Sequence, residues 1–283
     1  MKVQRFSSTD GFVVWDLDDA TTSTGVVRVA PKVLQDGAVL LARATTYAFA
    51  AFGVRGRAGA SAALNSKPDQ RDEAVKAFVE EVRPLAEEGR LQLAPGVGIE
   101  ADDLAPLGWT PPDPTVQAAG AVAAARVAGP LDWRTAAVVG SDPVAVAATE
   151  QLQAAGAPLA EGRYDAACDV LFVAGKAGCL DHDTAATVQA SLIVPLTPVP
   201  VTARALAVLS RSGRTVVPDF LSTAAPLLAA HDGGNPADPI QRIRDATIEL
   251  AGEGPGMWLA AAQRAEEHLA TWTAEKPFGR PLA

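Results

Sequence analysis

One turn in the second half of the sequence has the arrangement of a nucleotide-binding loop. A strand-like segment at 135–140 leads into Gly140, Ser141 and Asp142, and a helix-like segment follows directly. In a G-x-G-x-x-G/A turn the first glycine allows the tight bend, and the second lets the backbone approach a pyrophosphate held at the helix N-terminus. Gly140 stands at the first of these positions and Ala145 at the last.

The middle glycine of this pattern is replaced by Asp142, which brings a side chain and a negative charge to an anion site. Asp142-Pro143 is also the pattern of a helix N-cap followed by proline at the first helical position. A capping carboxylate satisfies amide groups that a phosphate would otherwise use. We therefore interpret Gly140, Ser141 and Asp142 as a degenerate cofactor site. No bound cofactor is expected; NAD or NADP is the expectation if the site survives.

Other polar residues give weaker signals. Arg55 and Arg57 lie in a glycine-containing loop, where one of them would grip a substrate carboxylate or both would be solvated charges; an arginine stays protonated and cannot act as a base. His182 sits in Asp-His-Asp, which favours a helix cap over a metal ligand. The three histidines, His182, His231 and His268, share no ligand spacing, so no metal is expected.

Alternating segments in the second half of the chain predict a parallel sheet with crossover helices. The expected strands are 135–140, 169–174, 191–195 and 214–218, and the expected helices are 143–155, 181–190, 201–212, 219–230, 238–251 and 256–273. The stretch 160–167 is too short for a further strand-helix unit. Glu161 lies where an acid would bind a ribose, but in so short a stretch we interpret it as a loop acid.

The first half predicts a second α/β unit. Strands are expected at 11–16, 25–30, 60–64 and 91–94, and helices at about 31–52 and 69–89, the second capped by Asp69. Residues 95–114 contain five of the 21 prolines and form a candidate hinge. A further helix is expected to start at Asp113-Pro114.

Three motifs in sequence order carry a resemblance to a known family. They are LLARATTYAFAAFGVRGRAGASAAL at 40–64, GRLQLAPGVGIEADDL at 89–104, and a set formed by CDVLFVAGKAG at 168–178, SLIVPLTPVPVTARAL at 191–206 and GRTVVPDFLSTAAP at 213–226. Together they resemble the glutamate/leucine/phenylalanine/valine dehydrogenase family. Each motif alone is a weak indicator of this family. The three motifs in this order and at this spacing are a specific one.

The resemblance implies an N-terminal oligomerisation and substrate domain, then a dinucleotide-binding domain, with an active site between them. The expected fold class is α/β, with an N-terminal α/β oligomerisation domain and a reduced Rossmann-like parallel-sheet domain. The expected domains are 1–112, 113–230, and C-terminal helices at 231–283 that pack back across both.

The residues that such a dehydrogenase needs are absent from the matching positions. The family's carboxylate-gripping lysine falls on Ala48, its catalytic lysine on Ala60 and its proton-shuttling aspartate on Gly96. An asparagine of the last motif falls on Thr223. Groups of this kind act together, so the loss of all three is expected to remove amino-acid oxidation.

The amino-acid composition argues against some classes of binding partner. The formal net charge is -9, which argues against nucleic acid and anionic membrane surfaces as partners. The N-terminus has no apolar signal-peptide core, and no segment of about 18 apolar residues is long enough to span a bilayer. The two cysteines, Cys168 and Cys179, suit a reducing cytoplasm and form no zinc pattern.

The sequence favours a non-catalytic relative of the dehydrogenases that acts as a homo-oligomer or as a regulatory or scaffolding subunit beside a complete enzyme. One alternative is an active NAD(P)-dependent oxidoreductase with a rebuilt site that uses Arg55, Arg57, Asp102, Asp103 or Asp142. The other alternative is a small-ligand sensor that uses the old cleft without turnover.

Overall fold

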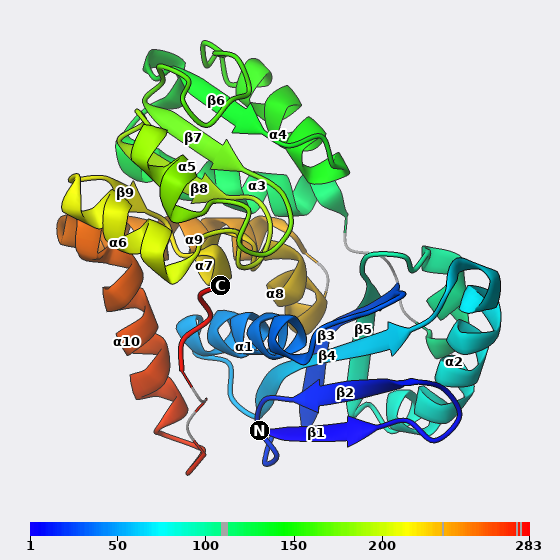
Figure 1. Ribbon diagram of the computed structural model, residues 1–283. Helices are drawn as coiled ribbons and strands as arrows, with labels where there is room; N and C mark the ends of the chain where they lie inside the picture. The colour runs from blue at the N-terminus through cyan, green and yellow to red at the C-terminus, as the bar shows by residue number, and fades with distance from the viewer. Residues whose placement is uncertain (109–112, 234, 276, 278) are drawn as a thin grey trace. The chain divides into compact units, whose positions relative to one another are not determined.

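The computed structural model describes residues 1–108, 113–233, 235–275, 277 and 279–283 (Figure 1). The chain divides into two compact units, Met1–Pro111 with Glu266–Pro281, and Pro112–Ala265 with Leu282–Ala283. Part of the candidate hinge, 109–112, lies outside the described residues. Within the described ranges, no helix combines the length and the apolar composition needed to cross a bilayer.

The first unit is built on a five-stranded sheet in the order β1-β2-β4-β3-β5. Its strands are β1 (Lys2–Arg5), β2 (Gly11–Trp15), β3 (Thr22–Ala30), β4 (Arg57–Asn65) and β5 (Leu91–Pro95). β4 pairs parallel with β3 and antiparallel with β2, and β5 pairs parallel with β3. The sequence did not predict β1, whose four residues are all exposed, so it carries no buried alternation.

Two helices cover the two faces of this sheet. Side chains alternate between faces along a strand, so Val27, Val29, Ala60 and Ala62 pack with α2 (Arg71–Glu87), whereas Ala63 packs with α1 (Gln35–Ala51). The same alternation turns the intervening β3 side chains, which include Thr24, Val26 and Arg28, to the α1 face. This alternation decides which candidate residues share a face.

Both helix starts differ from the prediction. α1 begins at Gln35 and not near Pro31, because the Val33 N–H donates to Asn65 Oδ1 at 2.8 Å and holds the segment after β3 extended. Asp69 lies inside a 3₁₀ turn, η1 (Pro68–Gln70), and caps no helix, since α2 starts only at Arg71.

The second unit contains a four-stranded, wholly parallel sheet in the order β6-β7-β8-β9. Its strands are β6 (Ala136–Val139), β7 (Val170–Val173), β8 (Leu192–Pro195) and β9 (Thr215–Val216), joined by α4 (Pro143–Ala154), α5 (His182–Thr187) and α6 (Ala203–Arg211). All residues of β7 and β8 are buried, as expected when helices cover both faces. The predicted α/β class with a Rossmann-like parallel sheet is confirmed.

The sheet of the second unit is reduced at its β6 edge. Between α4 and β7 only Leu159 makes a parallel bridge, to Ala136, and residues 160–167 contain no strand or helix. The missing strand-helix unit expected from the length of this segment is therefore confirmed.

The remaining helices are α3 (Pro114–Ala125), α7 (Asp219–Ser222), α8 (Ala225–Asp232), α9 (Ala237–Glu249) and α10 (Met257–Leu269), with short 3₁₀ turns η2 (Ala101–Leu107), η3 (Arg126–Ala128), η4 (Leu131–Trp133) and η5 (Ala251–Gly256). The Asp113 carboxylate caps α3, as predicted. The single helix predicted at 219–230 is instead two helices, because Pro226 lacks an N–H and disfavours a continuous helix through the residues before it.

A close approach of α1 to β4 fixes the packing of the first unit. A Cβ placed on Gly59 would lie 1.6 Å from the carbonyl oxygen of Ala42, and the Gly59 N–H donates to Thr46 Oγ1 at 2.8 Å. The helix therefore rests on the strand at a point where only glycine fits.

We predict that Gly59→Ala lowers the free energy of unfolding by about 2 kcal/mol or more, because the added methyl overpacks a tight helix–strand contact. Chemical denaturation monitored by circular dichroism measures this. Gly252→Ala is the control, since a Cβ there meets no described atom within 4 Å. An unchanged denaturation midpoint for Gly59→Ala would contradict the packing described.

Candidate functional site

The start of α4 is occupied by a carboxylate from the chain itself. Asp142 Oδ1 accepts hydrogen bonds from the N–H groups of Val144, at 3.0 Å, and Ala145, at 2.9 Å. These are two of the amide groups that a helix leaves without partners at its N-terminus. The predicted cap is confirmed, and an incoming phosphate would have to displace this carboxylate.

The turn before this helix keeps only part of the nucleotide-binding pattern. Gly140 has φ 122°, and a Cβ there would lie 2.7 Å from Cβ of Ala174 at the end of β7, so this position requires glycine. Ser141 is exposed. Gly140 thus serves the packing between two strand ends as well as the bend itself.

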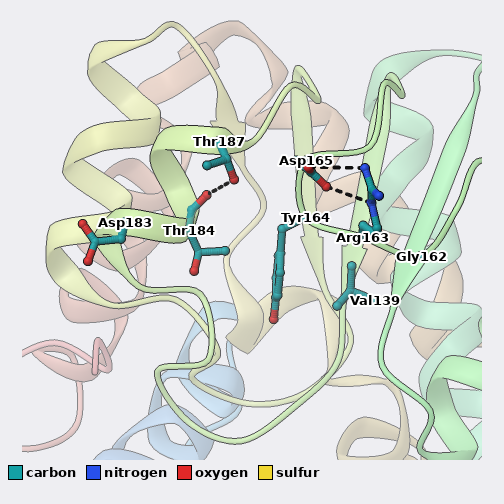
Figure 2. Close-up of a pocket in the computed structure, with 8 residues that line it drawn as sticks. All are labelled: Val139, Gly162, Arg163, Tyr164, Asp165, Asp183, Thr184 and Thr187. Carbon is teal, nitrogen blue, oxygen red and sulfur yellow. Dashed lines mark hydrogen bonds and ion pairs between the residues drawn. The ribbon is translucent and has the colours of Figure 1, made fainter.

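An open pocket of about 580 Å³ lies beside the carboxyl end of β6. Figure 2 shows the Tyr164 side chain in this pocket, between residues of α5 and Val139 at the end of β6. The lining residues are Val139, Gly162, Arg163, Tyr164, Asp165, Asp183, Thr184 and Thr187. The carboxyl ends of parallel strands, where the connections diverge, are the usual ligand sites of such sheets. Gly140, Ser141 and Asp142 are not among these lining residues.

The charges of the pocket do not favour a phosphate. Arg163 is its one cation among the lining residues, and its Nε lies 3.1 Å from Asp165 Oδ1. Glu161 lies 3.6 Å from the same guanidinium and 74 % of its side chain is exposed, as expected for a loop acid. Burial raises the pKa of Tyr164, and the nearby Cys179 side chain adds to the shift. The pocket is therefore aromatic and acidic.

The segment that builds this pocket replaces the missing strand-helix unit. A Cβ on Gly162 would lie 2.4 Å from the carbonyl oxygen of Val138, so the loop crosses close to the end of β6. Opposite it, the Asp181 carboxylate accepts from the Thr184 N–H at 2.9 Å and caps α5, as predicted for the Asp-His-Asp sequence. Among the described residues, no three His, Cys, Asp or Glu side chains converge as a metal site would require.

A buried carboxylate supports the loop after β8. Asp219 Oδ2 accepts the N–H of Val199 at 2.8 Å, and Val199 has a positive φ of 55°. Burial raises the pKa of Asp219 to about 6. Thr223, at the family's asparagine position, donates its hydroxyl to the Asp219 carbonyl oxygen at 2.8 Å. These contacts are internal to the loop and to α7.

In the first unit, the three positions expected to carry catalysis provide no polar side chain. Ala48 is buried within α1, and Ala60 is buried in β4 on the α2 side. The two alanines therefore belong to different layers. Gly96 follows β5, and its N–H donates to the Val27 carbonyl oxygen at 2.8 Å.

The charged side chains proposed as substrate-binding candidates in the first unit already form contacts with other residues of that unit. Arg55 Nη2 donates to the Thr271 carbonyl oxygen at 2.8 Å. Arg57 Nη1 donates to Gln92 Oε1 at 3.2 Å, the guanidinium lies over the Phe49 ring, and burial lowers the pKa of Arg57. Asp103 forms a tight ion pair with Arg71.

One cation of the first unit was not singled out from the sequence. Arg28 extends from β3 beside Gly96, and its Nε and Nη2 atoms are buried with no hydrogen-bond partner among the described residues. The only sequence signal was a charged residue inside the otherwise apolar strand GVVRVA.

Solved structures share this fold. An L-tryptophan dehydrogenase from Nostoc punctiforme superposes with a TM-score of 0.75 at 18 % identity, over 95 % of this chain and 96 % of the other. A hetero-hexameric glutamate dehydrogenase from Thermus thermophilus, in its Leu-bound form, gives 0.74 at 18 % identity, over 94 % and 86 %. Another glutamate dehydrogenase gives 0.79 at 14 % identity, over 95 % and 83 %.

These similarities confirm the fold expected from the three motifs, which is that of the amino-acid dehydrogenases. No protein-family model matches the sequence, and no curated protein matches it either. At these identities the similarity establishes the fold and leaves the activity to be argued from the residues.

We predict that Asp142→Ala lowers the free energy of unfolding by about 1 kcal/mol, because two amide groups of α4 lose their acceptor. Asp142→Asn is the matched control, since asparagine caps helices as well as aspartate does. Thermal and urea unfolding of both variants measure the difference. Equal destabilisation by alanine and asparagine would show that the side chain acts through its charge and not as a cap.

Proposed function

We propose that this chain is a non-catalytic member of the amino-acid dehydrogenase family, that it has lost NAD-dependent oxidative deamination, and that it acts as a homo- or hetero-oligomeric subunit. The observation that carries the proposal is the Asp142 carboxylate, which accepts hydrogen bonds from two amide groups at the start of α4. A pyrophosphate brought to this helix would meet a negative charge where it needs donors.

The first unit supports the same conclusion. Oxidation of an amino acid needs a cation for the carboxylate, an amine of lowered pKa, and a carboxylate that moves protons. Ala48, Ala60 and Gly96 offer none of these groups. Arg55 and Arg57 do not replace them, because both guanidinium groups already donate to oxygen atoms within the first unit and an arginine does not act as a base.

The role as a subunit rests on the retained fold. The structural similarity spans 86 % of a glutamate dehydrogenase that assembles as a hetero-hexamer. A chain that keeps this architecture without the catalytic groups fits the place of a structural or regulatory partner. We place it in the cytoplasm, with a related dehydrogenase or a second copy as its partner and no nucleic acid.

The activity test is direct. We predict no NADH or NADPH formation from any of the twenty L-amino acids, because hydride transfer requires both a bound nicotinamide and the missing proton-transfer groups. Absorbance at 340 nm measures this, and the reverse reaction with 2-oxo acids and ammonium is the complement. Protein-dependent turnover that scales with enzyme concentration would contradict the proposal.

The association test is separate. We predict that the purified chain elutes as an oligomer, alone or after coexpression with a complete amino-acid dehydrogenase encoded beside it. Light scattering coupled to size exclusion gives the mass of each species. A chain that is monomeric at micromolar concentration and forms no complex with such an enzyme would remove the subunit role while leaving the loss of catalysis intact.

A further inference from the structure

The pocket beside the carboxyl end of β6 is large enough to hold a small molecule. Its volume of about 580 Å³ lies within the range of ligand pockets, roughly 300–1,000 Å³. All of its lining residues belong to the second unit, which runs from Pro112 to Ala265. Neither the loss of catalysis nor the role as a subunit gives this pocket a purpose.

The loop between α4 and β7, which forms one wall of the pocket, is fixed at several points. The Ala160 N–H donates to a β6 carbonyl oxygen at 2.8 Å, and Gln189 Nε2 donates to the Asp165 carbonyl oxygen at 2.9 Å. Burial and a hydrogen bond with the Cys179 side chain raise the pKa of Tyr164, so its hydroxyl stays neutral and anchored while the residue lines the pocket. A ligand therefore meets a preformed wall, and little ordering of the loop opposes its binding.

The two threonine hydroxyls of the pocket donate their hydrogens to the chain itself. The Thr187 hydroxyl donates to the Thr184 carbonyl oxygen at 2.8 Å. The N–H and the hydroxyl of Thr184 both donate to the Asp181 carboxylate and lower its pKa. A hydroxyl has one hydrogen and two lone pairs. Each threonine oxygen can therefore accept a hydrogen bond from a ligand, but neither has a hydrogen left to donate.

The charges around the pocket have an excess of acid. Arg163 is the one guanidinium among the lining residues, and it is shared between Asp165, 3.1 Å from its Nε, and Glu161, 3.6 Å from its Nη1. Asp183 also lines the pocket, and its carboxylate lies 3.3 Å from His182 Nε2. Clustered carboxylates produce a negative potential that attracts cations and repels anions.

An aromatic ring lies between these charges. Figure 2 shows the Tyr164 ring between α5, which carries Asp183, and Val139 at the end of β6. The face of an aromatic ring attracts organic cations, and its apolar surface favours a flat apolar body. A carboxylate or phosphate would be repelled by the excess of acid. An ammonium group instead supplies the positive charge and the hydrogen-bond donors that match these acceptors.

We propose that this pocket binds a small organic cation, in which a primary ammonium group is joined to an aromatic body and no carboxylate is present. The aromatic body packs against Tyr164 and Val139. The ammonium group donates to the carboxylate and threonine oxygens that line the pocket. Such a ligand is neither an amino acid nor a dinucleotide, and its binding involves no turnover. The site is therefore independent of the loss of dehydrogenase activity.

The primary experiment is isothermal titration of the full chain, at neutral pH and low ionic strength, with 2-phenylethylamine, an alkylamine that is protonated at this pH. Three comparison compounds separate the contributions: 2-phenylethanol has the body without the charge, ethylamine has the charge without the ring, and L-phenylalanine adds a carboxylate. We expect 2-phenylethylamine to bind at least tenfold more tightly than each of them. A Kd weaker than about 1 mM for 2-phenylethylamine would overturn the proposal, as would equal binding of any comparison compound.

A first variant tests the aromatic wall. Tyr164→Leu keeps an apolar side chain and removes the ring, so it should weaken 2-phenylethylamine binding at least tenfold. Thermal unfolding of the same sample shows whether the variant is folded. A folded Tyr164→Leu protein that retains the affinity would place the ligand elsewhere and refute the site.

A second variant keeps the test decisive if Tyr164→Leu does not fold. Asp183→Asn changes a side chain that is 86 % exposed, so the fold should tolerate it. It should weaken 2-phenylethylamine severalfold and leave 2-phenylethanol unaffected, because it lowers only the negative potential of the pocket. Asp238→Asn, at an exposed acid of the same unit outside the pocket lining, makes the same change in net charge and should leave binding unchanged. Undiminished binding in Asp183→Asn, or an equal loss in Asp238→Asn, would contradict the proposed site.

Discussion

Two amide groups at the start of α4 donate to the Asp142 carboxylate, at 3.0 and 2.9 Å. In a parallel α/β sheet, the start of the helix after the first strand is a place where backbone donors and the helix dipole together attract a phosphate. Here the chain supplies its own anion to that place. The neighbouring loop is also changed: the strand-helix unit after α4 is reduced to the Leu159 bridge and a loop that carries Tyr164 into the pocket beside β6. Both changes argue against the binding of a dinucleotide at this site.

The first unit has changed in a related way. Glycine at position 96 replaces a carboxylate expected from the family resemblance, and Cγ of Arg28 lies 2.7 Å from the place that a Cβ there would occupy. The three positions at which the family resemblance places catalytic groups are occupied by Ala48, Ala60 and Gly96, none of which carries a polar side chain.

Short sequence patterns predicted several of the helix starts and buried strands. Asp142-Pro143 and Asp113-Pro114 predicted two helix starts because capping depends on adjacent residues. The apolar runs of β7 and β8 predicted buried parallel strands. The edge strand β1 escaped prediction because none of its residues is buried.

The unpartnered Nε and Nη2 atoms of Arg28 also escaped prediction, because only the fold shows what surrounds this side chain, with Gly37 near its guanidinium and Gly96 near its Cγ. The proposed division at 112 and 230 stays a prediction. In the structure, residues up to Ala265 cluster with the second unit, and Glu266–Pro281 clusters with the first.

The central claim is that Asp142 has closed the phosphate site of α4. Isothermal titration of the purified chain with NAD, NADP and ADP-ribose tests it most directly, because these ligands share the pyrophosphate. The account predicts no measurable binding, with any Kd weaker than about 1 mM, which corresponds to less than roughly 4 kcal/mol of binding free energy. A micromolar Kd for any of the three would show that the helix start still accepts a pyrophosphate and would contradict the account.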